Sequence, residues 1–570
     1  MKKIVFFVLS LQMALTACKK DGLKPDATIQ EDTIPTDPSL LTTQGFFFDL
    51  WKAKSFTTPT SVSEVTPPAS ATVTVSVNTG NILSKMPNTI FGNNSNLWIG
   101  QINTESILMN HLINFQPGIL RGPAGSVSDL FFFNTDHMPE DAPSTLLSAN
   151  GTGSTAGYWY GKNTQSWTFS IDGYYDMLHK TGSIGLLTVN YGYARYGTST
   201  DPVAAAAHLA ADWVRYDKGR TKYWEVGNEV FGDWEAGYRI DTEKNKDNQP
   251  EIVTGALYGK HFKVFADSMR KAAAQTGFPI QIGAVLYDSE PETWNTTTIK
   301  TWNSGYFSQA GDYADFYSVH NYFTPYNENS TVNTILNSAT SIPASVITYV
   351  KKTIRQAGVS QKPIAMTEWN LFCSGSKQNV SHLAGMHAVI ALGELVKNGY
   401  GASLRWDLAN GWSNGDDHGL FSLGDEPDGI TKWTPRPTFF YMYYYQRYTG
   451  DRMLASTVSG SSDVLAYATS FTSGEKGVVL VNTGTSVKNV AINFEHFTPG
   501  NKIYFYTLTG GNDNGEFSRM VYINNTPPEN GKAGGPLSYT TIKARSSTLT
   551  GGIRVTLPAR SVVFSVVAKK

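Results

Sequence analysis

The feature that most constrains the fold is the alternation of short apolar runs with helical stretches between residues 86 and 440. This alternation favours a parallel sheet whose strands are connected by helices. Eight strand–helix units are the number that closes a (β/α)8 barrel. A doubly wound open sheet is the alternative, but no glycine-rich dinucleotide-binding turn follows the first run, so we expect the barrel. The eight predicted strands are Thr89–Asn94, Gly118–Arg121, Ile184–Asn190, Tyr223–Asn228, Pro279–Leu286, Phe316–His320, Pro363–Glu368 and Ala402–Asp407.

The residues after 440 have a different pattern, in which strand-like runs are separated by Gly, Asn and Asp turns. Several runs alternate apolar and polar residues, as half-buried antiparallel strands do. We therefore predict a β-sandwich over 441–570, and we expect a strand within 71–85 to pair with it. The runs are Val464–Ala468, Gly477–Asn482, Val487–Phe494, Lys502–Thr509, Arg519–Asn524 and Ile553–Val567.

The first residues combine a positive start, an apolar run over 4–15 and the word Leu15-Thr16-Ala17-Cys18. The run is too short to span a bilayer as a helix, and the word resembles a bacterial lipobox. We expect 1–17 to be a lipoprotein signal peptide and Cys18 to carry a lipid anchor; an ordinary signal peptide is the alternative. Lys19 favours the outer membrane, facing either the cell surface or the periplasm. Residues 18–70 have the composition of a linker, interrupted by an aromatic patch at 46–51.

Composition excludes several kinds of partner and cofactor. The chain has 46 Lys+Arg and 47 Asp+Glu, a balance that argues against nucleic acid. Only two cysteines occur, so no disulfide framework is expected, and Cys373 is interpreted as a buried thiol. There is no H-E-x-x-H, C-x-x-C or P-loop motif, so we expect neither a metal nor a cofactor. An acidic cluster at Asp416, Asp417, Asp425, Glu426 and Asp428 could bind calcium, but it lacks EF-hand spacing and a solvated loop is expected.

Two predicted strands end in a polar cluster built around a glutamate, Glu229 after the fourth and Glu368 at the seventh. Because barrel chemistry gathers at the carboxyl ends of the strands, both should lie on the same rim. Two facing carboxyl groups are what acid-assisted glycoside cleavage requires. Glu225 lies on the same side of its strand but deeper, and we interpret it as structural.

The words Trp224-Glu225-Val226-Gly227-Asn228-Glu229 and Thr367-Glu368-Trp369-Asn370 resemble the acid/base and nucleophile motifs of clan A glycoside hydrolases. The similarity is greatest to family 51 α-L-arabinofuranosidases, with families 39 and 79 also similar. It extends over roughly residues 75–570 and includes the words that begin at Leu120, Val189 and His320. Ala124 departs from the family pattern, which has Gly there, and so does the long loop after the eighth strand; these departures leave the substrate open.

The resemblance implies retaining double displacement, with Glu368 as nucleophile and Glu229 as acid/base. It further implies that Glu368 is ionised and Glu229 protonated at rest. Asn228 and Asn190 are expected to contact or orient the sugar, Arg121 to hydrogen-bond Glu368, and His320 and Tyr322 to orient the two carboxylates. Five tryptophans in or after strands are candidate sugar platforms: Trp98, Trp234, Trp369, Trp406 and Trp412.

The expected substrate is a plant or algal polysaccharide or oligosaccharide. An exo-acting arabinofuranosidase competes with a clan A endo-glycanase and with other exo-glycosidases of the xylosidase, galactosidase or glucuronidase type. A non-catalytic glycan-binding lipoprotein is a further alternative. Such a protein would usually have lost one carboxylate, whereas this sequence retains both.

Overall fold

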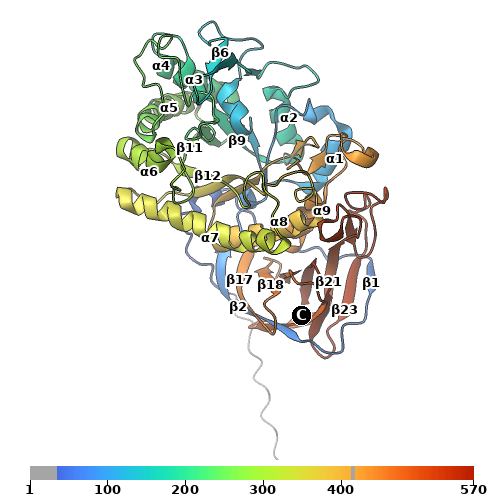
Figure 1. The fold of residues 1–570 in the computed structure, drawn as a ribbon. Helices are drawn as coiled ribbons and strands as arrows, with labels where there is room; N and C mark the ends of the chain where they lie inside the picture. Colours follow the sequence, from blue (N-terminus) through green and yellow to red (C-terminus); the bar gives the residue numbers. More distant parts are fainter. Residues whose placement is uncertain (1–34, 413–416) are drawn as a thin grey trace, which may run out of the picture.

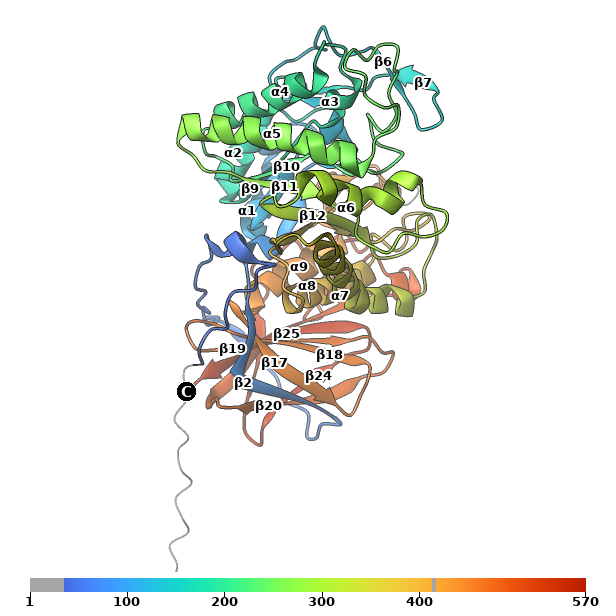
Figure 2. The same ribbon diagram turned by 90° about the vertical axis from the view of Figure 1, so that its left-hand side faces the viewer.

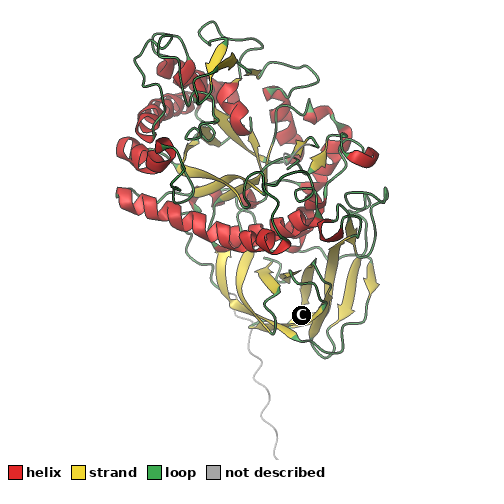
Figure 3. Ribbon diagram, in the orientation of Figure 1, coloured by secondary structure: helices red, strands yellow, loops and turns green. Residues whose placement is uncertain are grey.

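The computed structural model describes residues 35–412 and 417–570. The predicted signal peptide, Cys18 and Asp416 lie outside these ranges. Figure 1 shows a ring of helices around a central barrel and, below it, a separate layer of strands formed mainly by the C-terminal part of the chain. Figure 3 shows the same division by secondary structure.

The barrel is closed by eight parallel strands in the order of the chain, and the last strand pairs with the first. Each strand overlaps one of the eight predicted runs, so the (β/α)8 prediction is confirmed. The strands are β3 (Gly92–Asn94), β4 (Ile119–Gly122), β9 (Ile184–Val189), β10 (Tyr223–Val226), β11 (Gln281–Val285), β12 (Phe316–Tyr322), β13 (Ile364–Asn370) and β14 (Ala402–Arg405).

Helices cover the outside of the barrel and begin and end at the residues that capping chemistry favours. The Asp201 side chain accepts from the backbone N–H of Ala204 at the start of α4, and Gly277 ends α5 in the left-handed region at φ 75°. The helices are α1 (Ser106–Phe115), α2 (Ile171–Thr181), α3 (Gly192–Tyr196), α4 (Pro202–Asp217), α5 (Gly255–Thr276), α6 (Thr297–Ala310), α7 (Val332–Ala357), α8 (His382–Lys397) and α9 (Pro437–Tyr448).

The second sheet is mostly antiparallel. The predicted run over 553–567 is two strands, β24 and β25, because the chain turns at 558–560, where Arg560 has a φ of 45°. β24 pairs with β20, whereas β25 lies between β19 and β21. The strands are β1 (Val62–Glu64), β2 (Val73–Lys85), β17 (Arg452–Ser459), β18 (Val464–Ser470), β19 (Lys476–Asn482), β20 (Lys488–Glu495), β21 (Pro499–Gly510), β22 (Val521–Ile523), β23 (Ala544–Thr548), β24 (Ile553–Leu557) and β25 (Ser561–Lys569).

Strand β2 precedes the barrel in the chain but belongs to the second sheet, where it pairs with β17 and β20. Its side chains at 73, 75 and 77 are buried and alternate with half-buried ones, so one face of the strand packs into the core of that sheet. The chain therefore leaves the second unit, completes the barrel and returns (Figure 2).

The aromatic patch that had no assignment from sequence closes the amino-terminal mouth of the barrel. It forms the short helix η1 (Gly45–Phe48), and Phe47 is 2 % exposed. The Phe47 ring lies 4.9 Å from that of Tyr223 and 5.6 Å from that of Phe316, at the starts of β10 and β12. Part of the expected linker is thus folded against the barrel.

Short elements complete the described chain. Those between β4 and β9 belong to a long insertion, whose strand β6 lies near α3 and α4 at the top of Figure 1. Among the described helices, none is both long enough and apolar enough to cross a membrane. The short elements are β5 (Phe131–Phe132), β6 (Thr145–Leu147), β7 (Gly153–Thr155), β8 (Trp159–Tyr160), β15 (Ala409–Asn410), β16 (Phe421–Ser422), η2 (Asn88–Ile90), η3 (Ile102–Thr104), η4 (Gly125–Leu130), η5 (Pro427–Gly429) and η6 (Gly515–Phe517).

Candidate active site

Glu229 and Glu368 meet at the carboxyl ends of the barrel strands. Glu229 follows β10, and Glu368 lies near the end of β13. One oxygen of each carboxyl group and one ring nitrogen of His320 all lie within 4.8 Å of one another. Glu368 is buried and the Glu229 side chain is 17 % exposed, so both carboxyl groups are largely shielded from solvent.

Glu368 is held by two donors. The Tyr322 hydroxyl donates to Oε1 at 2.6 Å, and Arg121 Nη1 donates to Oε2 at 3.3 Å. Burial raises the pKa of Glu368, and it outweighs the opposing effects of the charges on His320 and Arg121 and of the Tyr322 hydrogen bond. These two donors are the ones expected from the sequence.

Glu229 is held by His320 and Trp234. His320 Nδ1 lies 2.9 Å from Oε1, and the Trp234 indole N–H donates to Oε2 at 3.0 Å. Burial opposes ionisation of Glu229, but the hydrogen bond and the charge of His320 outweigh it and lower its pKa. The other ring nitrogen of His320 lies 3.1 Å from the Thr367 hydroxyl, which fixes the plane of the imidazole.

The two pKa shifts run opposite to the order that the resemblance implies, because burial raises the pKa of Glu368 whereas the His320 hydrogen bond lowers that of Glu229. Burial opposes a charge on His320, but the nearby charges of Glu368 and Glu229 raise its pKa. His320 Nδ1 is 2.9 Å from Glu229 and 3.7 Å from Glu368, so only Glu229 gains its hydrogen bond, while the charge of His320 lowers the pKa of both carboxyl groups. A protonated imidazole at His320 therefore has Glu229 as its nearer carboxylate partner.

Arg121 organises the floor of the site. Its Nε donates to Glu225 at 2.7 Å, and both side chains are fully buried. Glu225 also accepts from the hydroxyls of Thr188 and Ser318. A buried carboxylate with these partners holds the arginine in place, which supports the structural interpretation of Glu225.

Asn228 has its amide orientation set from both sides. Arg121 Nη2 donates to Oδ1 at 2.8 Å, and Nδ2 donates to Glu235 at 2.9 Å. Because an amide nitrogen carries two hydrogens, the other hydrogen of Nδ2 is available to a ligand oxygen. The structure thus keeps Asn228 as a candidate sugar contact.

Two buried acids near this amide were not anticipated. Burial raises the pKa of Glu235 well above its usual value, and the charges of Asp129 and Glu229 add to this effect. Asp129 accepts from the backbone N–H groups of Tyr191, Gly192 and Asn228, and burial raises its pKa to about 6. Sequence offered one signal, because Glu235 stands six positions after Glu229 in the same strand-end loop.

The five candidate tryptophans lie in different environments. Trp369 is fully buried and packs against Phe323 and His387, so its assignment as a sugar platform is wrong. Successive side chains of a strand point to opposite faces, so Trp369 points to the helix layer when Glu368 points inward. Trp234 contacts Glu229 directly.

The other three tryptophans lie in half-buried positions. The rings of Trp98 and Trp406 lie 5.9 Å apart. A side chain at Gly125, in the turn after β4, would collide with the Trp406 ring. The guanidinium of Arg519 lies over the Trp412 ring, 4.9 Å from the ring centre. Because Arg519 belongs to the C-terminal β-sheet unit, Trp412 faces that unit.

Asn190 does not serve as the expected substrate contact. Its Nδ2 donates to the Phe131 carbonyl and the Tyr196 hydroxyl, and its Oδ1 accepts from the backbone of Tyr193. Both ends of the amide are used to hold the loop after β9, because that loop needs partners for its buried backbone groups.

The acidic loop after β14 is only in part the solvated loop that we expected, because Asp425 and Asp428 are exposed but the other two described acids are not. Asp417 is fully buried, and Glu426 is paired with Arg436 and Arg519 at 2.8 Å each. Two arginines neutralise Glu426, so the described members of the cluster do not converge on a cation. Cys373 is a buried thiol, as predicted, and it donates to the Gly375 carbonyl.

A third buried acid, Asp407, lies beside the nucleophile candidate. Burial raises its pKa to about 8, and the charge of Glu368 adds to this. Asn96 donates to it. Asp407 ends the eighth predicted strand, and its position at the rim could have drawn attention to it.

Among the described residues, Glu229, His320 and Glu368 are close enough together to hold a metal ion. Such an ion would have to replace the hydrogen bond between His320 and Glu229 and would stand near the Arg121 guanidinium. Like charges so close together disfavour a cation here.

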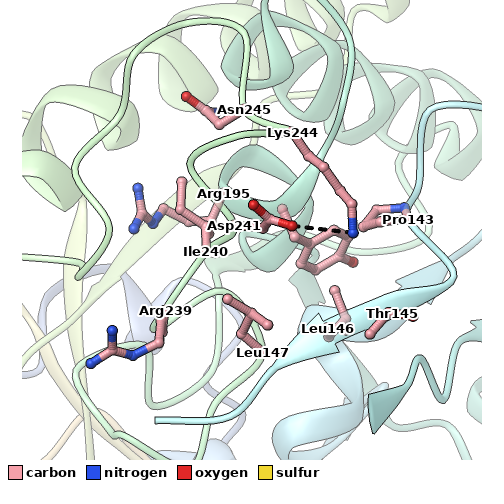
Figure 4. A pocket seen from close by; sticks show the side chains of 11 residues that line it. Pro143, Thr145, Leu146, Leu147, Arg195, Arg239, Ile240, Asp241, Lys244 and Asn245 are labelled. Atoms are coloured by element: carbon pink, nitrogen blue, oxygen red, sulfur yellow. Dashed lines mark ion pairs between the residues drawn. The ribbon is translucent and has the colours of Figure 1, made fainter. Parts of the chain in front are cut away.

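A separate pocket lies beneath the long insertion (Figure 4). Leu146 and Leu147 form one side, and Arg195 and an ion pair between Asp241 and Lys244 at 3.2 Å form another. Neither Glu229 nor Glu368 lines it, so it is distinct from the carboxylate pair.

No protein-family model and no curated protein matches this sequence. Solved structures do match its fold. The chain is similar to an α-L-arabinofuranosidase from Thermotoga maritima, solved with arabinose, at 17 % identity and a TM-score of 0.59, covering 87 % of this chain and 99 % of that one. It is also similar to a family 51 α-L-arabinofuranosidase from Bifidobacterium longum at 14 % identity and a TM-score of 0.58, covering 88 % and 100 %.

A bifunctional glucanase-xylanase from a metagenome library matches at 13 % identity and a TM-score of 0.56, covering 87 % of this chain and 99 % of that one. At such identities the likeness establishes the fold. The resemblance indicated by the motifs is therefore confirmed for the barrel and the appended β-sheet unit.

Proposed function

We propose that the protein is a retaining glycoside hydrolase that cleaves a plant or algal polysaccharide or oligosaccharide by double displacement. The observation that carries the proposal is the approach of one Glu229 oxygen and one Glu368 oxygen to within 4.8 Å. Retaining enzymes hold their carboxyl groups about 5–5.5 Å apart, and inverting ones roughly 6.5–9.5 Å apart to admit a water. An oxygen–oxygen approach within 4.8 Å supports the closer, retaining arrangement, in which one carboxylate attacks directly.

In the first step Glu368 attacks the anomeric carbon, and the bond to the leaving oxygen breaks as Glu229 delivers a proton to it. The proton reaches Glu229 from His320 along their 2.9 Å hydrogen bond. Loss of the imidazolium charge then leaves Arg121 and Tyr322 as the groups that stabilise ionised Glu368.

In the second step Glu229, now ionised, removes a proton from water, and the resulting oxygen nucleophile displaces Glu368 from the anomeric carbon. Two inversions at this carbon give net retention. Asn228 is placed to donate its remaining amide hydrogen to the sugar.

We propose an α-L-arabinofuranoside as the first substrate to test, because the motif resemblance is greatest to family 51. The structural neighbours also include a glucanase-xylanase, so clan A endo-glycanases and other exo-glycosidases stay as the second candidates. A non-catalytic glycan-binding protein is disfavoured because both carboxylates are present and oriented.

The test is a panel of aryl glycosides together with arabinan, xylan and galactan. The parent protein should cleave at least one of them with retention, seen by proton NMR of the first-formed anomer. Glu368→Gln should abolish turnover without unfolding the protein. Glu229→Ala should spare substrates with excellent leaving groups and regain rate with added azide, whereas Glu328→Gln, at an exposed site after β12, is the matched control. An inverted product, or full activity in Glu368→Gln, would refute the mechanism.

We also propose lipid attachment at Cys18 and residence in the outer membrane, on the strength of the lipobox-like word. Radiolabelled palmitate should label the parent protein in a bacterial host and should not label Cys18→Ser. Labelling that persists in Cys18→Ser would exclude Cys18 as the attachment site.

A further inference from the structure

We propose that a pocket between the amino-terminal ends of α5 and α6 is a second carbohydrate subsite. It would hold an uncharged sugar residue in the leaving part of the substrate, beyond the bond that Glu229 and Glu368 cleave. This inference rests on the proposed function and extends it from a single glycosidic bond to a longer chain.

The pocket has a volume of about 550 Å3, within the roughly 300–1,000 Å3 range of small-molecule sites. Its walls are rich in hydroxyl groups from Thr254, Thr296, Thr297 and Thr301, with Tyr238 beside them. Thr254 and Thr296 accept from backbone N–H groups as helix caps and keep an O–H to donate, whereas Thr301 donates to the Thr297 carbonyl and keeps lone pairs to accept. The wall can thus both donate to and accept from the hydroxyl groups of a sugar.

The two helices whose ends carry the pocket threonines are closely packed. A side chain at Gly255, the first residue of α5, would lie 2.1 Å from the Trp302 carbonyl of α6. The two helices therefore touch at this end and lie side by side in both views (Figures 1 and 2). This contact fixes how close the two helix ends can come to each other.

The pocket is joined to the carboxylate pair through the loop after β10. Asp233 lines the pocket, and the next residue, Trp234, donates to Glu229. The same loop is anchored by Phe231, whose ring lies 5.9 Å from that of Trp302. This connection through Trp234 favours the Glu229 side of the site, which is the side of the leaving oxygen in the proposed mechanism.

Two exposed indoles stand next to lining residues in the chain. Trp234 follows Asp233 and is 57 % exposed, and Trp294, two positions before Thr296, is 79 % exposed. Tryptophan is one of the largest apolar side chains and is highly buried on average, so these exposed rings are available for stacking on a sugar.

The charges around the pocket favour a neutral sugar over a uronate. Arg239 lines the wall, but it is paired with Glu251 and donates to the Ala149 carbonyl. Asp233 places an exposed carboxylate at the edge. The charges at the pocket therefore do not attract the carboxylate of a uronate, and an uncharged pentose or hexose unit is the ligand that fits.

The experiment blocks the pocket with Thr301→Arg and removes the outer indole with Trp294→Ala. Thr348→Arg is the matched control, because Thr348 is also an exposed helical threonine whose hydroxyl donates to the carbonyl four residues earlier. The probes are the aryl glycoside that the parent protein cleaves and oligosaccharides of increasing length that end in the same sugar.

In both pocket variants the ratio of kcat/KM for the longest oligosaccharide to that for the aryl glycoside should fall by about tenfold, the loss of one sugar contact. In Thr348→Arg the ratio should stay at the parent value. A ratio in Thr301→Arg that equals the control overturns the subsite, although cleavage of the aryl glycoside still supports the proposed function.

If the parent protein cleaves no glycoside, the proposed function fails and the pocket is tested by calorimetric titration with arabino-, xylo- and galacto-oligosaccharides. Binding that is lost in Thr301→Arg and kept in Thr348→Arg supports the pocket as a carbohydrate site. No binding to the parent protein overturns it.

Discussion

The hydrogen bond from Tyr322 to Glu368 allows a direct test of which carboxylate is the nucleophile. Tyr322→Phe removes one hydroxyl that donates to Glu368 Oε1 at 2.6 Å and leaves the ring stacked on Phe372 at 3.9 Å. A hydrogen bond to a charged group contributes about 1.5–3 kcal/mol. Its loss should destabilise ionised Glu368 and raise a pKa that burial already raises.

If ionised Glu368 is required for attack, activity falls as the pH drops through its pKa. At about 1.4 kcal/mol per pH unit, the acidic limb of the kcat/KM profile should move to higher pH by about one to two units. The measurement is a pH–rate profile with an aryl glycoside.

The control is Tyr326→Phe, which makes the same change four residues away on an exposed ring that also packs on Phe372. Its acidic limb should match that of the parent protein. An acidic limb in Tyr322→Phe that coincides with that of Tyr326→Phe would refute the assignment of Glu368 as the ionised nucleophile.

The remaining predictions concern stability. Phe47→Ala should lower the free energy of unfolding by about 3–5 kcal/mol, because it leaves a cavity where the ring packs in the barrel mouth. Phe48→Ala removes a half-buried ring and should lower it less. Equal denaturation midpoints for the two variants would contradict the role of Phe47 in closing the barrel. Arg121→Met should cost about 3–5 kcal/mol, because it leaves Glu225 as a buried charge without its partner. Adding Glu225→Gln should recover part of this loss in urea unfolding, and no recovery would mean that the ion pair is not the cause. Because the pKa of Glu368 is raised on folding, its contribution to stability is greatest at acidic pH and is lost as the pH rises through that pKa; in Glu368→Gln this loss should be absent from the pH dependence of unfolding.

Sequence alone was sufficient for the barrel, for the appended β-sheet unit and for the two glutamates. The period of the apolar runs marked all eight barrel strands, and strand polarity placed Glu229 and Glu368 on one rim. Both inferences depend on local patterns that a parallel barrel converts directly into spatial order. The roles expected of Arg121, His320 and Tyr322 as partners of the carboxylates agree with the contacts in the structure, because the resemblance supplied the pairing.

Other features depended on contacts between distant parts of the chain. The sequence could not show that Trp369 faces the helices or that Trp234 contacts Glu229, because the strand pleat and the path of the loop determine these directions. It could not place Phe47 in the barrel mouth, because a short apolar patch in a linker has no partner until the barrel exists. The opposite pKa shifts of the two carboxyl groups also depended on the structure, because His320 Nδ1 is close enough to hydrogen-bond Glu229, at 2.9 Å, but lies 3.7 Å from Glu368. Residue types and their periodicity thus determined the scaffold and the reacting groups, whereas burial and short-range electrostatics, which exist only after folding, decided how those groups are poised.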